Sequence, residues 1–249
     1  MRIAVLADIH SNLEALEAVL ERISGLHATG IVCLGDIVGY NANPNECIDL
    51  IKSSNITCVA GNHDVVACER EPPARFNQLA RIAIEWTREQ LTDVNRQFLM
   101  KLPRQQQVHD LMTFHGYIHD TDRYLFDAND ARNNFQLLKG LAGDPWLGFF
   151  GHTHVRTVFS DENGATEAGP ALEVSLSPAN RYLINPGSVG QPRDLAPRAS
   201  FLIYDADGSR ITFHRVEYDI QTCQEKILRA GLPPRLAERL ASAGLRGSQ

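Results

Sequence analysis

The amino-acid sequence predicts an α/β fold that begins with parallel strands and ends with additional β structure. Over the first 60 residues, short apolar runs alternate with amphipathic segments, a pattern typical of parallel strands joined by helices. After about residue 155, β-like runs separated by Gly and Pro turns predominate and indicate a second sheet.

The first elements are expected in the order strand, helix, strand, helix, strand. Residues 2–7 form the first expected strand, and a helix follows over residues 13–25, where Ser11 to Glu14 matches a capping box. The expected continuation is a strand at 30–34, a helix at 44–53 and a strand at 56–60.

The middle of the chain is predicted to be helical. Residues 75–90 and 92–101 have apolar residues at helical spacing, and we interpret about residues 70–103 as a helical insert or cap beside the site. Later strands are expected at 107–115, 146–150, 155–159, 172–175, 182–185, 200–204 and 210–216, and helices at 129–141, 219–230 and 233–243. No linker or repeat interrupts this order, so we expect residues 1–249 to form a single domain.

Composition narrows the classes of partner and compartment. A net charge of -6 lacks the basic character usual for nucleic-acid-binding proteins, so nucleic acid is a weakly supported but open substrate. Five cysteines without a close pair indicate reduced thiols and therefore a cytoplasmic protein. No apolar run approaches the roughly 18 residues of a membrane span, so we expect no membrane association.

Residue types that bind divalent metals follow five of the expected strands. Because ligands of an α/β sheet lie beyond the carboxyl ends of its strands, these side chains could surround one crevice, and the simplest interpretation is a two-metal hydrolytic site. A lone Asp in such a place is often only a helix cap, but the recurrence favours ligation. The candidates are Asp8, His10, Asp36, Asn62, His63, Asp64, His115, His152 and His154.

The spacing of the candidates supports this interpretation. Asp8 and His10 are two residues apart, so they would project to the same side of an extended chain, and His152 and His154 repeat the spacing. Asp36 has two carboxylate oxygens and is suited to bridge two cations. Mixed nitrogen and oxygen ligands favour Mn, Fe, Co, Ni or Zn. Three of the candidates directly follow a glycine, whose missing Cβ lets the chain turn sharply or come close to the ions. These glycines are Gly35, Gly61 and Gly151.

These motifs together resemble the calcineurin-like metallophosphoesterases. The segment Asn185 to Arg193 extends the resemblance to small bacterial and archaeal phosphoesterases of that superfamily. The matching motifs are Asp8-Ile9-His10, Gly35-Asp36, Gly61-Asn62-His63-Asp64, His115-Gly116 and Gly151-His152-Thr153-His154.

The resemblance implies a four-layer αββα sandwich of two mixed β-sheets flanked by helices. It implies one metal held by Asp8, His10 and His154, a second held by Asn62, His115 and His152, and Asp36 shared between them. It also implies that His63 lies near the substrate phosphate and that Asp64 orients His63.

The expected function is therefore that of a metal-dependent phosphoesterase. A metal-bridging hydroxide would attack a phosphodiester or phosphomonoester of a small, nucleotide-like or other phosphorylated substrate. Arg193 is a candidate substrate contact, and the Gly-rich turn before it could cradle an anion or simply be a turn. Alternatives are a single-strand nuclease and a non-catalytic scaffold of the same fold. A protein phosphatase is less favoured because Asp64 stands where its signature has Glu. A homo-oligomer is compatible with the amphipathic C-terminal helices.

Overall fold

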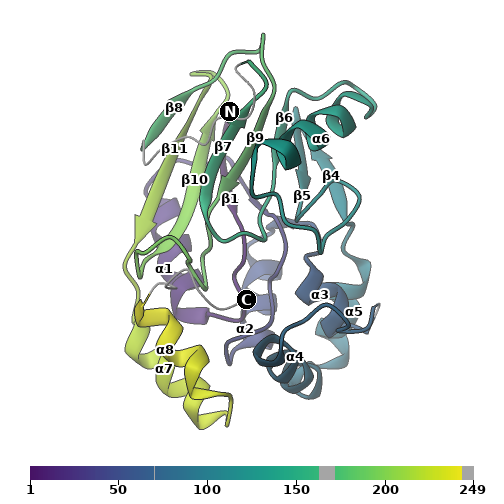
Figure 1. Cartoon of the computed structure of the whole chain (residues 1–249). Coiled ribbons are helices and arrows are strands. Elements are labelled where there is room, and N and C mark those ends of the chain that lie inside the picture. Colours follow the sequence, from purple (N-terminus) through teal and green to yellow (C-terminus); the bar gives the residue numbers. More distant parts are fainter. Residues whose placement is uncertain (70, 163–171, 243–249) are drawn as a thin grey trace.

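Two β-sheets form the centre of the molecule (Figure 1). The computed structural model describes residues 1–69, 71–162 and 172–242. Within these residues, one sheet has six strands in the order β3 (Thr57–Cys58), β2 (Gly30–Cys33), β1 (Arg2–Leu6), β10 (Ala199–Asp205), β11 (Arg210–Val216) and β8 (Glu173–Ser175). The other has five in the order β4 (Gln105–Val108), β5 (Leu111–Phe114), β6 (Leu147–Phe149), β9 (Tyr182–Pro186) and β7 (Arg156–Ser160).

Both sheets are mixed, and helices cover their outer faces. In the six-stranded sheet β1, β2 and β3 are parallel and β10 pairs antiparallel to β1; in the five-stranded sheet β5, β6 and β9 are parallel. The helices are α1 (Leu13–Ser24), α2 (Pro44–Ser53), α3 (Asn62–Ala67), α4 (Gln78–Gln90), α5 (Asp93–Lys101), α6 (Ala128–Lys139), α7 (Ile220–Arg229) and α8 (Pro234–Ser242).

Alternation along β1 shows how the layers pack. Val5 faces the five-stranded sheet and joins a core that includes Phe149 and Ile184, whereas Leu6 faces outward and packs with Leu16 of α1. This follows from the two-residue period of a strand, which sends successive side chains to opposite faces. On the far side, α6 packs against the outer face of the five-stranded sheet. The order helices, sheet, sheet, helix is the expected four-layer αββα sandwich.

The strands after residue 155 are distributed between the two sheets, which differs from the prediction that they form a second sheet. Strands after residue 155 do not form a sheet of their own, because β8, β10 and β11 extend the sheet begun by β1 while β7 and β9 join β4, β5 and β6. Periodicity identifies a strand but carries no information on its pairing partner, which depends on long-range contacts.

Several local predictions also need correction. Residues 107–115 do not form one strand: β4 and β5 form an antiparallel pair, with His109 at φ 56° in the turn. Asn12, not Ser11, caps α1 by accepting from the Ala15 N–H, while the Ser11 hydroxyl accepts from Gly39. The short helix α3 was not predicted. Of the helix expected over 233–243, the last residue, Ala243, lies outside the described residues.

The segment expected to be an insert or cap contributes α4 and α5. Both helices pack against α2 and α3, and Ile84 and Leu99 belong to the same apolar core as α1. Phe76, just before α4, reaches the candidate site, where its ring centroid is 4.5 Å from that of His63. The segment therefore packs against the core through α4 and α5, and it also contacts the candidate site through Phe76.

No helix among the described residues combines the length and apolar character that crossing a bilayer requires.

Candidate metal centre

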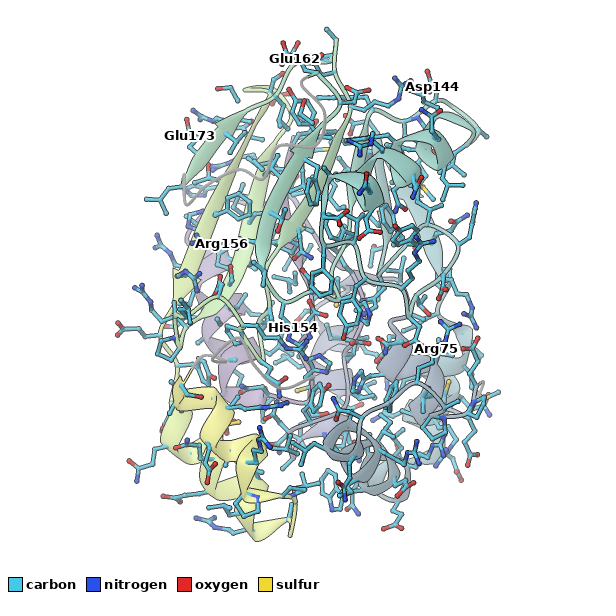
Figure 2. All side chains as sticks on the ribbon, viewed as in Figure 1. Arg75, Asp144, His154, Arg156, Glu162 and Glu173 are labelled. Carbon is cyan, nitrogen blue, oxygen red and sulfur yellow. The ribbon has the colours of Figure 1, made fainter. Side chains whose placement is uncertain are left out.

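The predicted ligands lie together beyond the strand ends of both sheets. Asp8 follows β1, Asp36 follows β2, and Asn62 begins α3. From the other sheet, His115 follows β5, and the loop after β6 carries His152 and His154. His154 lies near the middle of the molecule in Figure 2, between the strands and the helices at one end. The site therefore spans the junction of the two sheets.

The side chains form two groups that share one carboxylate. Potential ligand atoms lie within 4.8 Å of one another in each group, and every member is buried. The carboxylate Oδ2 of Asp36 is 3.5 Å from His10 Nε2 and 3.2 Å from His115 Nε2. One group contains Asp8, His10, Asp36 and His154, and the other contains Asp36, His115 and His152.

Backbone carbonyls fix the orientation of the four histidines in these groups. One ring nitrogen of each lies at hydrogen-bonding distance from a carbonyl oxygen, which leaves the other nitrogen facing into the site. Such outer contacts orient metal-ligating histidines and set their tautomer. The pairs are His10 Nδ1 with Val38 (3.1 Å), His115 Nδ1 with Leu34 (2.8 Å), His154 Nδ1 with Gln191 (2.6 Å) and His152 Nε2 with Asp122 (3.2 Å).

Atoms facing into the site fit a pair of cations. His10 Nε2 and His154 Nε2 are 3.1 Å apart, and His115 Nε2 and His152 Nδ1 are 3.2 Å apart. The buried oxygens Oδ2 of Asp8, Oδ2 of Asp36 and Oδ1 of Asn62 accept no hydrogen bond among the described residues. A buried polar atom without a partner is costly, and metal coordination satisfies all of these atoms at once.

The pKa shifts of the clustered side chains also favour metal binding. Burial raises the pKa of Asp8 to about 7, although His115 opposes the rise. Burial lowers the pKa of His10, His152 and His154 well below the usual range, which keeps these rings neutral and able to ligate. At His115, burial acts to lower the pKa, but the combined effects of Asp36, Asp8 and the Leu34 carbonyl outweigh it and raise the pKa to about 9. The site therefore attracts positive charge where a cation is expected.

The ligand loops are not extended, contrary to the spacing argument. Asp8 and His10 have φ angles of 56° and 49°, and His152 and His154 have φ angles of 68° and 59°. The backbone of Asp36 also lies in the left-handed region, at φ 54°. Non-glycine residues rarely adopt this region, and such strain concentrates at functional sites. Each pair of donors converges because the chain coils tightly, not because it is pleated.

Asn62 is held with its oxygen toward the site. Its amide Nδ2 donates to Asp122 Oδ1 at 3.0 Å, which orients Oδ1 as the free acceptor. Asp122 also accepts from His152 through its backbone carbonyl. Sequence reasoning missed Asp122, which lies in a loop without a distinctive motif.

His63 lies against the site but between aromatic rings. Its ring centroid is 4.6 Å from Tyr40, 4.5 Å from Phe76 and 4.8 Å from His10, and its backbone N–H donates to Asp36 Oδ1 at 2.8 Å. Burial lowers its pKa to about 4, although Asp36 opposes the shift. Its Nδ1 has no hydrogen-bond partner among the described residues.

Asp64 has partners different from those expected. One carboxylate oxygen accepts from the backbone N–H groups of Ile37 (2.9 Å) and Val38 (3.1 Å), and the other accepts from Gly61 (3.0 Å). Among the described residues, the Asp64 carboxylate makes no hydrogen bond to His63. Asp64 therefore ties the Asp36 loop to the start of α3 and positions His63 through the backbone.

The glycines before the ligands allow close approach, as predicted. A Cβ at Gly61 would lie 2.1 Å from Asp36 Oδ1, and one at Gly35, where φ is 92°, would lie 2.4 Å from the Gly61 nitrogen. A Cβ at Gly151 would lie 3.2 Å from Asp8 Oδ2. At Gly35 and Gly61 the ligand loops thus pack at distances that only glycine permits, and at Gly151 a Cβ would make a tight contact.

Residues 185–193 brace the metal loops instead of offering a free anion cradle. The N–H groups of Val189 and Gly190 donate to Ala7 and Asp8, both at 2.9 Å, and the Ser188 hydroxyl donates to the Asp8 carbonyl at 2.8 Å. Asn185 Nδ2 donates to Gly151 at 2.7 Å. These backbone donors are used internally, so the cradle interpretation is wrong for them.

Arg193 nevertheless lies at the site. Its backbone N–H donates to the His154 carbonyl at 3.3 Å, and its guanidinium contacts Gln191 Oε1 at 3.4 Å. The Tyr124 ring stacks on His152, with centroids 3.9 Å apart. Tyr124 was not among the predicted residues.

Comparison with known proteins agrees with this architecture. Residues 1–209 match the calcineurin-like phosphoesterase superfamily domain. The chain is 42% identical over 246 residues to the uncharacterised protein MJ0912 of Methanocaldococcus jannaschii, and the match covers 96% of each protein. A metallophosphoesterase structure from Sphaerobacter thermophilus has 40% identity and a TM-score of 0.85, covering 98% of this chain and 99% of that one.

A more distant structure shares the fold. The hypothetical protein PH1004 of Pyrococcus horikoshii has 22% identity and a TM-score of 0.81, with 99% of each chain covered. The family match, the relatives at 40% identity or more and the buried cluster of His and Asp support a metal-dependent phosphoesterase. The protein belongs to the calcineurin-like phosphoesterase superfamily.

Proposed function

We propose that the protein hydrolyses a phosphodiester or phosphomonoester of a small substrate with the aid of two divalent transition-metal ions. The observation that carries the proposal is the pair of buried ligand groups with Asp36 common to both. A shared carboxylate suits two adjacent cations, and the mixture of imidazole and carboxylate donors favours Mn, Fe, Co, Ni or Zn.

Each residue has an assigned task in this proposal. Asp8, His10 and His154 would hold one ion, and Asn62, His115 and His152 would hold the other, with Asp36 between them. When bound, the two cations would supply Lewis-acid polarisation of the phosphoryl oxygens and lower the pKa of water. The backbone carbonyls behind the histidine rings keep the imidazole lone pairs aimed at these positions.

His63 is proposed to act on the substrate and not on a metal. With a pKa of about 4 it is neutral at pH 7, so one ring nitrogen carries a proton that can be donated in a hydrogen bond to a phosphoryl or leaving-group oxygen. The rings of Tyr40 and Phe76 hold His63 in place, and Asp64 secures the segment that carries it.

The substrate and the cellular location are also proposals. A net charge of -6 supports a small phosphorylated substrate over a nucleic acid held by many phosphate contacts. Five buried free cysteines support a reducing compartment such as the cytoplasm.

The proposal is tested with chelator-stripped protein and two substrates, p-nitrophenyl phosphate and bis-p-nitrophenyl phosphate. Mn²⁺, Ni²⁺, Co²⁺, Zn²⁺ and Mg²⁺ are added back separately, and the ratio of the two rates separates monoester from diester preference. We expect turnover to return with at least one transition metal. Folded protein that binds two ions but is inactive with every metal would contradict the proposal and favour a scaffold, while cleavage confined to single-stranded DNA would favour a nuclease.

A further inference from the structure

Asp122 holds two of the residues assigned to one metal ion. Of the two proposed ions, the second is the one assigned to Asn62, His115 and His152. The carboxylate Oδ1 of Asp122 accepts from the Asn62 amide at 3.0 Å, and the Asp122 backbone carbonyl lies 3.2 Å from His152 Nε2. These contacts leave Asn62 Oδ1 and His152 Nδ1 facing into the site, where His152 Nδ1 is 3.2 Å from His115 Nε2.

Backbone groups hold the other ligand side chains. Backbone carbonyls orient the other three histidine rings, and backbone N–H groups donate to the carboxylates of Asp8 and Asp36. Within residues 1–69, 71–162 and 172–242, the Asp122 carboxylate is the one side-chain group from outside the proposed ligands that hydrogen-bonds a ligand side chain. In the same residues it makes no hydrogen bond or ion pair to Asp8, His10 or His154. A substitution of Asp122 therefore acts on one ligand group only.

The Asp122 carboxylate has a further partner in the segment before α4. Its Oδ2 lies 3.5 Å from a guanidinium nitrogen of Arg75, which is also 3.4 Å from Asp120 Oδ2. The Arg75 side chain is 67% exposed, whereas that of Asp122 is 21% exposed. Exposed ion pairs contribute little because water screens them. The hydrogen bond to buried Asn62 is therefore the contact of this carboxylate that we expect to matter.

We propose that Asp122 is a positioning residue that sets the affinity for the second ion and leaves the affinity for the first unchanged. This inference rests on the proposed function, since it takes Asn62 and His152 to be ligands of the second ion. Without the bond to Asp122, the Asn62 amide is free to rotate and present its NH₂ group, which donates hydrogen bonds and has no lone pair for a cation. The carboxylate also places negative charge beside the site, which favours a cation there.

Metal binding by the full chain tests this without turnover. Chelator-stripped protein is titrated by calorimetry with Mn²⁺ and, separately, with Zn²⁺, and elemental analysis after dialysis counts the bound ions. We expect wild-type protein to bind two ions, and Asn62→Ala identifies the binding step that belongs to the second. Asp122→Ala should weaken this same step about 10- to 100-fold, the usual effect of losing an outer-shell partner, and leave the other step unchanged.

Further variants separate the hydrogen bond from the ion pair. Asp122→Asn keeps an oxygen that can accept from Asn62, so it should lose less affinity than Asp122→Ala. Arg75→Gln removes the ion pair alone and should bind both ions as the wild type does. Asp144→Ala is the matched control, because Asp144 is 65% exposed, pairs with Arg181 and lies at the opposite end of the strands from the site (Figure 2).

The outcomes are distinct. Two unaltered binding steps in folded Asp122→Ala, or equal weakening of both steps, overturn the inference while leaving the proposed function intact. A loss in Arg75→Gln as large as that in Asp122→Ala also overturns it, because the ion pair would then be responsible. Circular dichroism checks folding, and Asp122→Ser repeats the truncation if the alanine variant does not fold. Wild-type protein that binds fewer than two ions of either metal would instead count against the proposed function.

Discussion

The Nε2 atoms of His10 and His154 lie 3.1 Å apart although 144 residues separate them in the sequence. Each ring is held from behind by a backbone carbonyl, so the two imidazoles cannot easily turn away from each other. Two nitrogen atoms held this close in a buried site are most readily satisfied by a shared cation.

Removal of metal should therefore destabilise the fold. A ligand that binds only the native state at 100 times its dissociation constant adds about 2.7 kcal/mol to the free energy of unfolding. We expect chelator-treated protein to have a lower Tm, and the Tm should rise with added Mn²⁺ in a concentration-dependent way. Differential scanning calorimetry measures this, and a Tm independent of every transition metal would contradict a folded-state metal site.

Asp36→Asn should lose metal and activity together. Asp36 belongs to both ligand groups, and an amide has neither the charge nor the second donor oxygen needed to bridge two ions. We expect a loss of metal affinity greater than about 100-fold, the upper range for loss of an outer-shell partner alone. Asp49→Asn is the control, since Asp49 is exposed on α2 and pairs with Lys52. Full activity of the Asp36 variant would disprove the two-metal hypothesis.

His63→Ala should separate catalysis from metal binding. His63 contacts Asp36 only through its backbone N–H, which alanine retains, whereas its ring is the part proposed to face the substrate. We expect kcat to fall about 10²- to 10⁴-fold, the usual contribution of a well-placed general acid. Metal content measured by elemental analysis should stay at the wild-type value, and a variant that also loses its metal would assign His63 to the metal site.

Arg193→Ala should mainly raise KM. Its guanidinium contacts Gln191, whose backbone carbonyl holds the His154 ring, and it has no acidic partner at ion-pair distance in the described part of the chain. Loss of uniform binding raises KM at constant kcat, by about tenfold or more for one charge-assisted pair. Arg193→Lys should recover part of the affinity because it keeps the charge without the fork. Steady-state kinetics identical to wild type would remove Arg193 from the substrate site.

Gly190→Ala should destabilise the protein through the metal loop. A Cβ at this position would lie 1.8 Å from the Ile9 carbonyl oxygen, so the segment that braces Asp8 must move. Overpacking of this kind costs about 1 to 3 kcal/mol or more. Gly30→Ala is the control, since a Cβ there meets nothing within 4 Å. Urea unfolding measures the difference in the free energy of unfolding between the two variants. Equal stabilities would show that the loop can shift without destabilising the protein.

Local sequence patterns were sufficient to predict most helices and strands and the His and Asp residues that the fold brings together in one buried cluster. The helix at Pro44–Ser53 and the strand at Arg210–Val216 were predicted at their observed bounds, because proline punctuation and residue alternation act locally. The metal-binding residue types stood out for a similar reason: Asp, Asn and His recur where buried strands end.

What the sequence determined by itself was thus the identity of the side chains and the order of the elements. Only the tertiary structure decided that β10 pairs with β1 and that Asp8 and His10 themselves adopt the left-handed backbone conformation. It also decided that backbone carbonyls orient the histidine rings, and that Asp64 connects two loops instead of bonding His63. These relationships join residues far apart in the chain, and their energies depend on burial and distance, which no local pattern encodes.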